Sequence, residues 1–509
     1  MAVQTRNNTT TSSSLPVTLV GLLFLALGIA AFVLLVNNII LALNARAEAE
    51  EFGTTFLRFL DNYGIIVPLI LIAIGVVLIR IGLSVLNRVI TAAAWGRQLL
   101  LWMLIASVVL AVQSLSQGFS SSDAFSGLGG GVLWLLIGGV FLLGYWWLGN
   151  NMHVFVGDET LAQASSRTAW NLLLPTVIVL VLVAARPLEA TFISSLTDER
   201  FASSQTVHFV GLNNYAQLLG IRFDVIGCTR GDDGVCATDD EGNLVFPRPR
   251  DVLDPGYQDL RFRDVVTIRI GESEFLVSGR DRDFMNSVGN TLLFTVISVT
   301  VELVLGIFIA MVINSKFTGR GLMRAAMLVP WAIPTVVSAR LWQTMFRDNQ
   351  SGVINNFFTN IIPILSSTQA WLANANLQVL ALIAVDVWKT TPFMALILLA
   401  GLQLIPADIY EAADVDGANK ARQFFQITLP LLRPTIAVAL VFRTLDAVRV
   451  FDVFQVLLGR QKLSMATYNY ETLVQNQQLG YASTIGVVIF VIILIFAVTY
   501  VRILGVNAE

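Results

Sequence analysis

The chain has 509 residues, of which 55% are hydrophobic and 13% charged, and its formal net charge is −3. Soluble domains carry about a quarter of charged residues, so this composition excludes an ordinary soluble fold and indicates a polytopic membrane protein. A near-neutral charge without a run of Lys or Arg also argues against nucleic acid as a partner.

Residues 1–14 are polar and rich in Ser and Thr, and we expect them to form a disordered cytoplasmic tail. Residues 15–150 are predicted to contain four transmembrane helices, because four apolar runs approach the roughly 20 residues that a membrane-spanning helix needs. A cleaved signal peptide is the alternative for the first run, since Ala45-Arg-Ala47 follows it, but this run is about twice as long as a signal core. The four runs are 15–43, 65–86, 99–112 and 128–148.

Six further apolar runs bring the predicted number of transmembrane helices to about ten, so the predicted fold class is an all-α polytopic membrane protein. An even number of spans places both termini on one side. Lys and Arg concentrate in the loops of that side, which predicts that it is the cytoplasmic side. These residues are Arg88, Arg97, Arg167, Lys316, Arg320, Arg324, Lys420, Arg422 and Arg433. The six runs are 170–185, 290–313, 323–342, 377–404, 435–458 and 485–503.

Residues 189–285 interrupt the apolar pattern, and by the same loop count they form an extracytoplasmic insert. Val265–Ile270 and Phe275–Val277 flank a short turn, which predicts that the insert is small and partly β. The chain's two cysteines, Cys228 and Cys236, both fall here, and on an oxidising outer face we expect a disulfide, with two free thiols as the alternative. A metal site is not expected, because the only histidine of the insert is distant from both cysteines.

Charged residues inside the predicted spans mark ion pairs or functional sites, because an ionised group in the bilayer needs a partner or water. Glu302 has no charged neighbour at helical spacing, so it either pairs with another helix or stays protonated. Asp386 and Lys389 are three residues apart on the eighth span and are expected to neutralise each other. Four charges recur at intervals of three along the ninth span, and because their face winds around the helix we expect that they cannot all point into one cavity. These four are Arg443, Asp446, Arg449 and Asp452.

Residues 406–430 form a charged interruption between the eighth and ninth spans that is too short for a domain. Asp408 is expected to cap a first short helix, Gly417 to supply a turn, and a second short helix to follow. The small residues of Glu411-Ala-Ala413 leave the first helix open to close approach by another protein, while Glu411 and Asp414 face outward. The loop is therefore predicted to be a docking element.

The order Glu-Ala-Ala, three residues, Gly, nine residues, Ile, one residue and Leu-Pro resembles the cytoplasmic coupling loop of binding-protein-dependent ABC importer permeases. The resemblance covers about residues 170–505 and is strongest to the oligosaccharide branch, which serves maltose, maltodextrin or trehalose. It implies a core permease domain of six transmembrane helices at 170–188 and 286–505, and it gives no role to the four additional N-terminal helices. The positions that it assigns to coupling with an ATPase are Glu411, Ala412, Ala413, Gly417, Ile427, Leu429 and Pro430.

In the related permeases the sugar lies between the spans on either side of this loop, which implies a substrate site at the matching positions. Sugar hydroxyls need carboxylates and guanidinium donors, and the sugar ring needs an aromatic face, which Phe393 or Trp388 is expected to provide. Pro392 is expected to loosen the helix nearby. Ion pairs that only hold the helices together are the alternative role for each charge. The matching positions are Asp386, Lys389, Thr390, Phe393, Arg443, Asp446 and Val450.

The sequence contains neither a Gly-x-x-x-x-Gly-Lys-Ser/Thr phosphate loop nor a nucleophile motif, so we expect neither an enzyme nor a cofactor bound by this chain. The resemblance implies a dimer of separate ATP-binding subunits that use ATP and Mg²⁺. It also implies a second permease subunit and an extracytoplasmic sugar-binding protein, at a bacterial inner membrane. The alternatives are an ion-coupled secondary transporter that uses Glu302 and Asp386, a permease for another solute such as glycerol 3-phosphate, and a membrane-embedded glycosyltransferase.

Overall fold

The computed structural model describes residues 14–44, 64, 66–120, 124–157, 160–203, 205–231, 235–240 and 242–503. Residues 1–13 of the predicted tail and Ala45-Arg-Ala47 lie outside these ranges. The chain divides into two compact units, Met1–Ile193 and Ser194–Glu509, and each is described by itself.

The first unit is built from paired apolar helices. Its helices are α1 (Ser14–Asn44), α3 (Ile66–Leu86), α4 (Ile90–Ser120), α5 (Ala124–Asn150), α6 (Leu161–Leu180) and α7 (Arg186–Ser194), with short helical turns at Met152–Val154 and Val181–Ala185. Helix α1 packs along α3, and α4 packs along α5. Glycines allow the first pair to approach closely, because a Cβ on Gly28 would lie 3.0 Å from the backbone oxygen of Gly75. Phe24, Leu78 and Leu100 are buried in a core that both pairs share.

The predicted membrane-spanning character is confirmed for most of the apolar runs. Eight helices of the described residues are long and apolar enough to cross a membrane, and a ninth span results if one bent pair is counted. The fifth predicted run, 170–185, lies in α6 and the π-helical turn that follows it, and it is not among the eight. Four of the first seven residues of α6 are polar, and Pro175 lies inside the helix. The eight spans are Leu15–Asn37, Pro68–Leu86, Ile90–Leu115, Gly129–Asn150, Arg282–Asn314, Ala375–Gln403, Lys420–Leu457 and Leu479–Tyr500.

A small sheet opens the second unit and confirms the partly β character of the insert. Strands β1 (Ile221–Gly227), β2 (Arg263–Ile270) and β3 (Ser273–Gly279) form an antiparallel sheet in the order β1-β3-β2. The predicted strand pair is β2 and β3, joined by a tight turn at Gly271 with φ +59°, whereas β1 was not predicted. Cys228 and Cys236 are joined by a disulfide. Short helices accompany the sheet at α8 (Asn213–Leu218), α9 (Pro249–Val252) and α10 (Pro255–Asp259).

Helix α16 lies at the centre of the helical part of the second unit. It packs against α11 and α19. In its most apolar stretch of 18 residues, 61% of the residues are buried, against at most 33% in any other described span. The helices are α11 (Arg282–Asn314), α12 (Arg320–Met327), α13 (Val329–Ala332), α14 (Thr335–Met345), α15 (Val353–Asn356), α16 (Ala375–Gln403), α17 (Ala407–Val415), α18 (Lys420–Gln423), α19 (Leu429–Val448), α20 (Asp452–Leu457), α21 (Met465–Tyr470) and α22 (Leu479–Ile503). Short π- and 3₁₀-helical turns lie at Phe357–Ile361, Phe424–Thr428, Gly459–Gln461 and Glu471–Gln475.

The predicted span 323–342 is sharply bent rather than straight. The segment Arg320–Ala332 and helix α14 meet at an angle of 89°. Ile333 at the bend is extended, with φ −71° and ψ 130°, because Pro334 follows it and disfavours helical geometry in the preceding residue. The bend leaves the last carbonyls of α13 without helical partners.

Candidate coupling loop and intramembrane cavity

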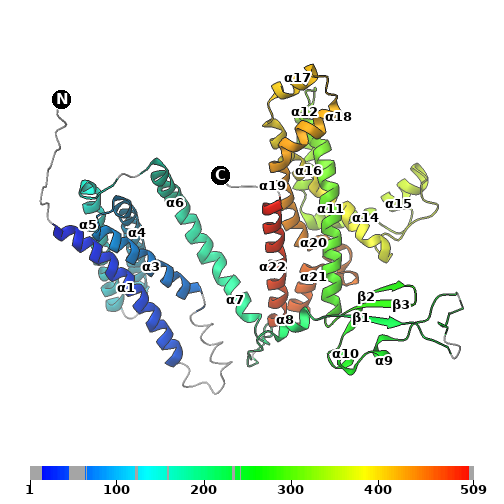
Figure 1. Cartoon of the computed structure of the whole chain (residues 1–509), viewed down its shortest axis with the longest axis horizontal. Coiled ribbons are helices and arrows are strands. Elements are labelled where there is room, and N and C mark those ends of the chain that lie inside the picture. The colour runs from blue at the N-terminus through cyan, green and yellow to red at the C-terminus, as the bar shows by residue number, and fades with distance from the viewer. Residues whose placement is uncertain are drawn as a thin grey trace. The chain divides into compact units, whose positions relative to one another are not determined.

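The loop between α16 and α19 folds as two short helices around a glycine turn, as predicted. Helix α17 begins after Pro406, and Gly417 adopts φ +73° between α17 and α18. The predicted cap at Asp408 is wrong, since the N-cap position is Pro406. Asp408 lies instead in the first turn, where its negative charge interacts favourably with the positive end of the helix dipole. Figure 1 shows α17 and α18 at one end of the second unit, with the three-stranded sheet at the other.

Hydrogen bonds within the loop fix its shape without a partner. Lys420 Nζ lies 3.0 Å from Asp414 Oδ1, and Gln423 donates to the backbone oxygen of Ala418 at 3.0 Å and also to Asp414. These bonds, first that of Lys420 and then that of Gln423, hold the pKa of Asp414 below its ordinary value. Asp414 therefore stays ionised at neutral pH, and the loop offers a partner a preformed surface.

The seven predicted coupling positions fall into two groups. Glu411, Ala412 and Gly417 are exposed, and Glu411 makes no hydrogen bond or ion pair within the described residues. The other four are buried or half-buried and shape the loop from below: Ala413, Ile427, Leu429 and Pro430. Val415 is 88% exposed and Phe425 64%, which adds two apolar side chains to the exposed surface of the loop. Sequence reasoning did not single out these two residues.

A buried ion cluster joins the three central helices. Arg443 of α19 is 3% exposed and contacts both oxygens of Glu302 on α11, with Nη2 3.0 Å from Oε1. Arg443 also pairs with Asp386 of α16, and its Nη1 lies 3.0 Å from Asp446 Oδ2. The hydroxyl of Thr390 donates to Glu302 Oε1 at 2.7 Å. Glu302 thus has the partner on another helix that was one of its two predicted states.

The predicted ion pair between Asp386 and Lys389 is not formed. Asp386 pairs with Arg443, and Lys389 Nζ donates to the backbone oxygens of Trp331 at 3.3 Å and Ile333 at 2.5 Å. These oxygens lie at the end of α13, where the bend has removed their helical partners. A cation at the negative end of a helix is favourable, so Lys389 stabilises the bend. The spacing of one helical turn between Asp386 and Lys389 therefore did not predict the partners that these two residues have in the structure.

A polar cavity of about 170 Å³ lies beside the ion cluster. All four alternating charges of the ninth span line it, so the prediction that they cannot share a cavity is wrong. The reason is that α19 ends at Val448 and α20 begins at Asp452, so the helical winding is interrupted within the series. The lining residues are Thr335, Asp386, Lys389, Thr390, Arg443, Asp446, Ala447, Arg449, Val450, Phe451, Asp452 and Val453.

Six of the seven predicted substrate positions line this cavity, and Phe393 does not. Phe393 stacks on Trp331 with ring centroids 5.8 Å apart and planes 8° apart. Trp388, the other predicted aromatic platform, packs edge-on against Trp342. Phe451 is the aromatic residue that does line the cavity, and sequence reasoning missed it. Helix α16 continues through Pro392, which is buried inside it.

Comparisons with known proteins agree with this architecture. Residues 302–505 match the family described as binding-protein-dependent transport system inner membrane component. The trehalose/maltose transport system permease protein MalF of Thermococcus litoralis is 42% identical over 228 residues, which cover 44% of this chain and 75% of that protein. The sulfoquinovosyl glycerol transport system permease protein SmoG of Agrobacterium fabrum is 37% identical, over 46% of this chain and 76% of its own. The trehalose transport system permease protein SugA of Mycobacterium tuberculosis is 38% identical, over 45% and 72%.

Proposed function

Because this chain belongs to the binding-protein-dependent transport system inner membrane components, we propose that it is the permease subunit of an ABC importer that moves an oligosaccharide of the maltose, maltodextrin or trehalose type into the cell. Two of the relatives described above are permeases of trehalose or trehalose/maltose systems, which supports the sugar class. The proposed location is the inner membrane, with both termini and the loop around Glu411 on the cytoplasmic side.

The exposed, preformed loop α17–α18 is the observation that carries this proposal. A rigid knob with an unpaired carboxylate at Glu411 and apolar side chains at Val415 and Phe425 is suited to insert into a groove of another protein. We assign that groove to an ATP-binding subunit, which binds ATP and Mg²⁺. Closure of the ATPase dimer would move the attached helices as rigid bodies and expose the cavity to each side in turn. Since the part of the chain that the structure describes offers one such loop, a second permease subunit engages the second ATPase.

We assign different roles to the charged residues of the ion cluster, some structural and one in sugar binding. Arg443 is held by Glu302 and Asp386, so these three residues brace α11, α16 and α19 against one another. Asp446 belongs to the same cluster, but its side chain is 68% exposed and lines the cavity. Its carboxylate is free to accept hydrogen bonds from sugar hydroxyls at the oxygen that Arg443 leaves open. Phe451 and Val450 contribute apolar surface for a sugar ring.

The same cluster weighs against the ion-coupled alternative. A secondary transporter would need Glu302 and Asp386 to bind and release a proton or Na⁺ during each cycle. Both carboxylates are already paired with one guanidinium, which remains charged under all ordinary conditions. A mobile coupling ion would therefore have to compete with Arg443 for these two carboxylates.

The proposal is tested by uptake into proteoliposomes that contain this chain, its second permease and the ATPase dimer, with the sugar-binding protein outside. Radiolabelled maltose, maltotriose, trehalose and glycerol 3-phosphate are offered in parallel. We expect ATP-dependent uptake of at least one of the three sugars, and no uptake when the ATPase is omitted. Selective uptake of glycerol 3-phosphate would contradict the sugar class, and uptake driven by an ion gradient alone would contradict the ABC mechanism.

A further inference from the structure

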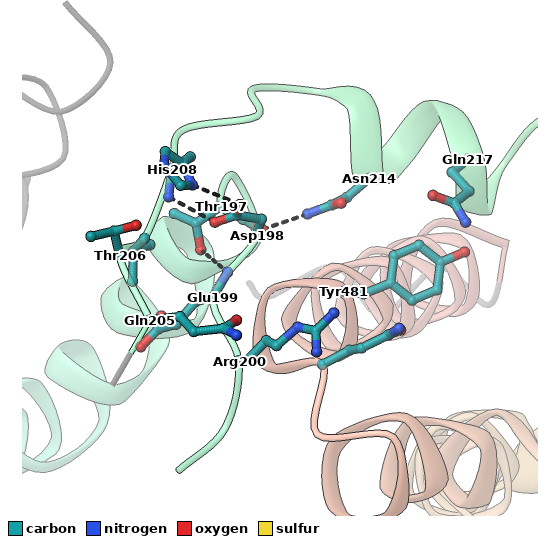
Figure 2. A pocket seen from close by; sticks show the side chains of 12 residues that line it. Thr197, Asp198, Glu199, Arg200, Gln205, Thr206, His208, Asn214, Gln217 and Tyr481 are labelled. Carbon is teal, nitrogen blue, oxygen red and sulfur yellow. Dashed lines mark hydrogen bonds and ion pairs between the residues drawn. The ribbon is translucent and has the colours of Figure 1, made fainter. Parts of the chain in front are cut away.

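A second polar pocket lies at the opposite end of the second unit from the coupling loop. It has a volume of about 590 Å³ and is formed by a loop that contains residues 197–200 and 205–208, by helix α8 and by the beginning of α22 (Figure 2). By the proposed topology this end faces the outside. A volume of this size falls in the range of small-ligand sites, which is about 300–1,000 Å³. None of the roles assigned above to the cavity, the ion cluster or the coupling loop uses this pocket.

Hydrogen bonds hold the wall of the pocket in a fixed shape. Asp198 accepts from the backbone N–H of His208 at 2.7 Å and contacts its Nδ1 at 3.0 Å, which closes the loop upon itself. Burial tends to raise the pKa of Asp198, but the bonds from His208 outweigh it and leave that pKa below its ordinary value. Asn214 donates to the backbone oxygens of Ser195 and Thr197, and the backbone of Glu199 accepts from the N–H of Gly480. The loop is therefore anchored to both α8 and α22.

Four long polar side chains line this fixed wall without partners of their own. The side chains of Arg200, Gln205, Gln217 and Gln478 make no hydrogen bond or ion pair within the described residues. Figure 2 shows Gln217 and Tyr481 on the side opposite the loop that carries Arg200 and Gln205. Three amides and one guanidinium supply up to eleven N–H donors, and each amide also supplies a carbonyl acceptor. These four side chains are exposed and available to a ligand, whereas the polar groups of the wall are held by the hydrogen bonds described above.

The chemistry of the lining fits a neutral, hydroxyl-rich ligand. Hydroxyls both donate and accept hydrogen bonds, and amide side chains offer both partners in one plane. Two carboxylates, Asp198 and Glu199, share the lining with one guanidinium and one imidazole, so neither sign dominates and a strongly charged ligand is not favoured. Tyr481 donates its hydroxyl to Asp281 at 2.6 Å, which fixes its phenol ring as an aromatic surface of the pocket. Val207 is the one aliphatic lining residue, and it gives an apolar protein side chain little to pack against.

We propose that this pocket is a second saccharide site, which holds an end of the oligosaccharide on the outer face before the sugar enters the cavity beside Asp446. The inference rests on the proposed function, because it takes the ligand to be the transported sugar. Arg200 and Gln478 are the residues that contact it most directly, since one comes from the loop and the other immediately precedes α22, and neither side chain has a partner among the residues that the structure describes. The site raises the local concentration of sugar at the mouth of the permease.

The experiment measures sugar binding to the full chain in lipid nanodiscs by isothermal titration calorimetry, with maltotriose and trehalose as the probes. Nanodiscs replace maltoside detergents, whose headgroups would compete for the site. Asp446→Ala first weakens the intramembrane cavity, and the binding that remains is expected to come from the outer pocket. Adding Arg200→Ala and Gln478→Ala to that chain is expected to weaken the remaining binding at least tenfold. The matched control is Arg263→Ala, which removes an exposed arginine of the same insert outside this pocket and is expected to leave binding unchanged.

The possible outcomes distinguish a failure of the outer saccharide site from a failure of the proposed importer function. If the chain with Asp446→Ala binds sugar and the two pocket substitutions leave its affinity unchanged, the outer site is refuted while the importer stands. If those substitutions spare sugar binding but weaken association with the sugar-binding protein, the pocket is a protein docking site and the saccharide proposal is equally refuted. If the complete importer moves no sugar in proteoliposomes, the proposed function itself fails, whatever the calorimetry shows.

Discussion

Replacing Arg443 by Met tests whether the buried ion cluster is a brace. Met has a similar length but no charge, so Glu302 and Asp386 would lose their cation while 0% and 6% exposed. Removing one partner of a buried ion pair costs about 3–5 kcal/mol, because the remaining charge is left uncompensated in a poorly hydrated site. The ion pair of Arg443 with Asp446 also disappears. We therefore expect Arg443→Met to lower the free energy of unfolding by about 3–5 kcal/mol.

The assay is equilibrium unfolding of the purified chain by SDS in mixed micelles, followed by tryptophan fluorescence. Arg449→Met is the matched control, since Arg449 lies near the end of the same helix but is exposed, and its loss is expected to cost less than about 1 kcal/mol. Adding Glu302→Gln and Asp386→Asn to Arg443→Met removes the stranded charges and is expected to recover most of the loss. An Arg443→Met chain as stable as the Arg449→Met chain, or a triple variant no better than the single one, would refute the brace.

Three further predictions concern the loop, the bend and the cavity. Glu411→Ala is expected to abolish ATP-dependent uptake and to release the ATPase in pull-downs while the thermal midpoint of unfolding stays unchanged. Asp416→Ala removes another exposed carboxylate of the same loop and should keep at least half of the uptake. Equal uptake by both variants would contradict the role of Glu411. Lys389→Met is expected to lower stability by about 1–3 kcal/mol, because two carbonyls at the end of α13 lose their donor, and Lys389→Arg should restore most of it in the same SDS titration. Asp446→Ala is expected to raise the KM for sugar at least fivefold with a loss of stability below about 1 kcal/mol, because its side chain is mostly exposed; an unchanged KM would leave Asp446 only a structural partner of Arg443.

Local sequence patterns were sufficient to predict most of the membrane-spanning helices and the helix–turn–helix shape of the loop around Gly417. Apolar runs of span length and the helix–glycine–helix pattern around Gly417 depend on neighbouring residues only, so they can be interpreted without knowledge of the tertiary fold. Strand β1 carried a similar local signal, since Ile221, Phe223 and Val225 alternate with Arg222 and Asp224, but its pairing with β3 spans about fifty residues of chain.

The partners of the buried charges depended on contacts that the sequence does not display. Lys389 stands one turn from Asp386, yet its donors go to carbonyls freed by the bend at Pro334, more than fifty residues earlier. The break after Val448 turned Arg449 and Asp452 toward the cavity, and no Pro or Gly marks that break. The six predicted substrate positions that line the cavity were selected because they flank the loop, whereas Phe451 was missed because it lies inside the break.

We expect the loop of α17 and α18 to lie in the cytoplasm and to be covered there by a separate ATPase. Val415→Cys places a single free thiol on this loop, since Val415 is 88% exposed and both native cysteines are joined in a disulfide. The measurement is labelling of that thiol by a membrane-impermeant maleimide in right-side-out and inverted membrane vesicles. We expect labelling in inverted vesicles only, and we expect the purified ATP-binding subunit to suppress it when it is added back. Labelling in right-side-out vesicles, or labelling that the ATPase leaves unchanged, would contradict it.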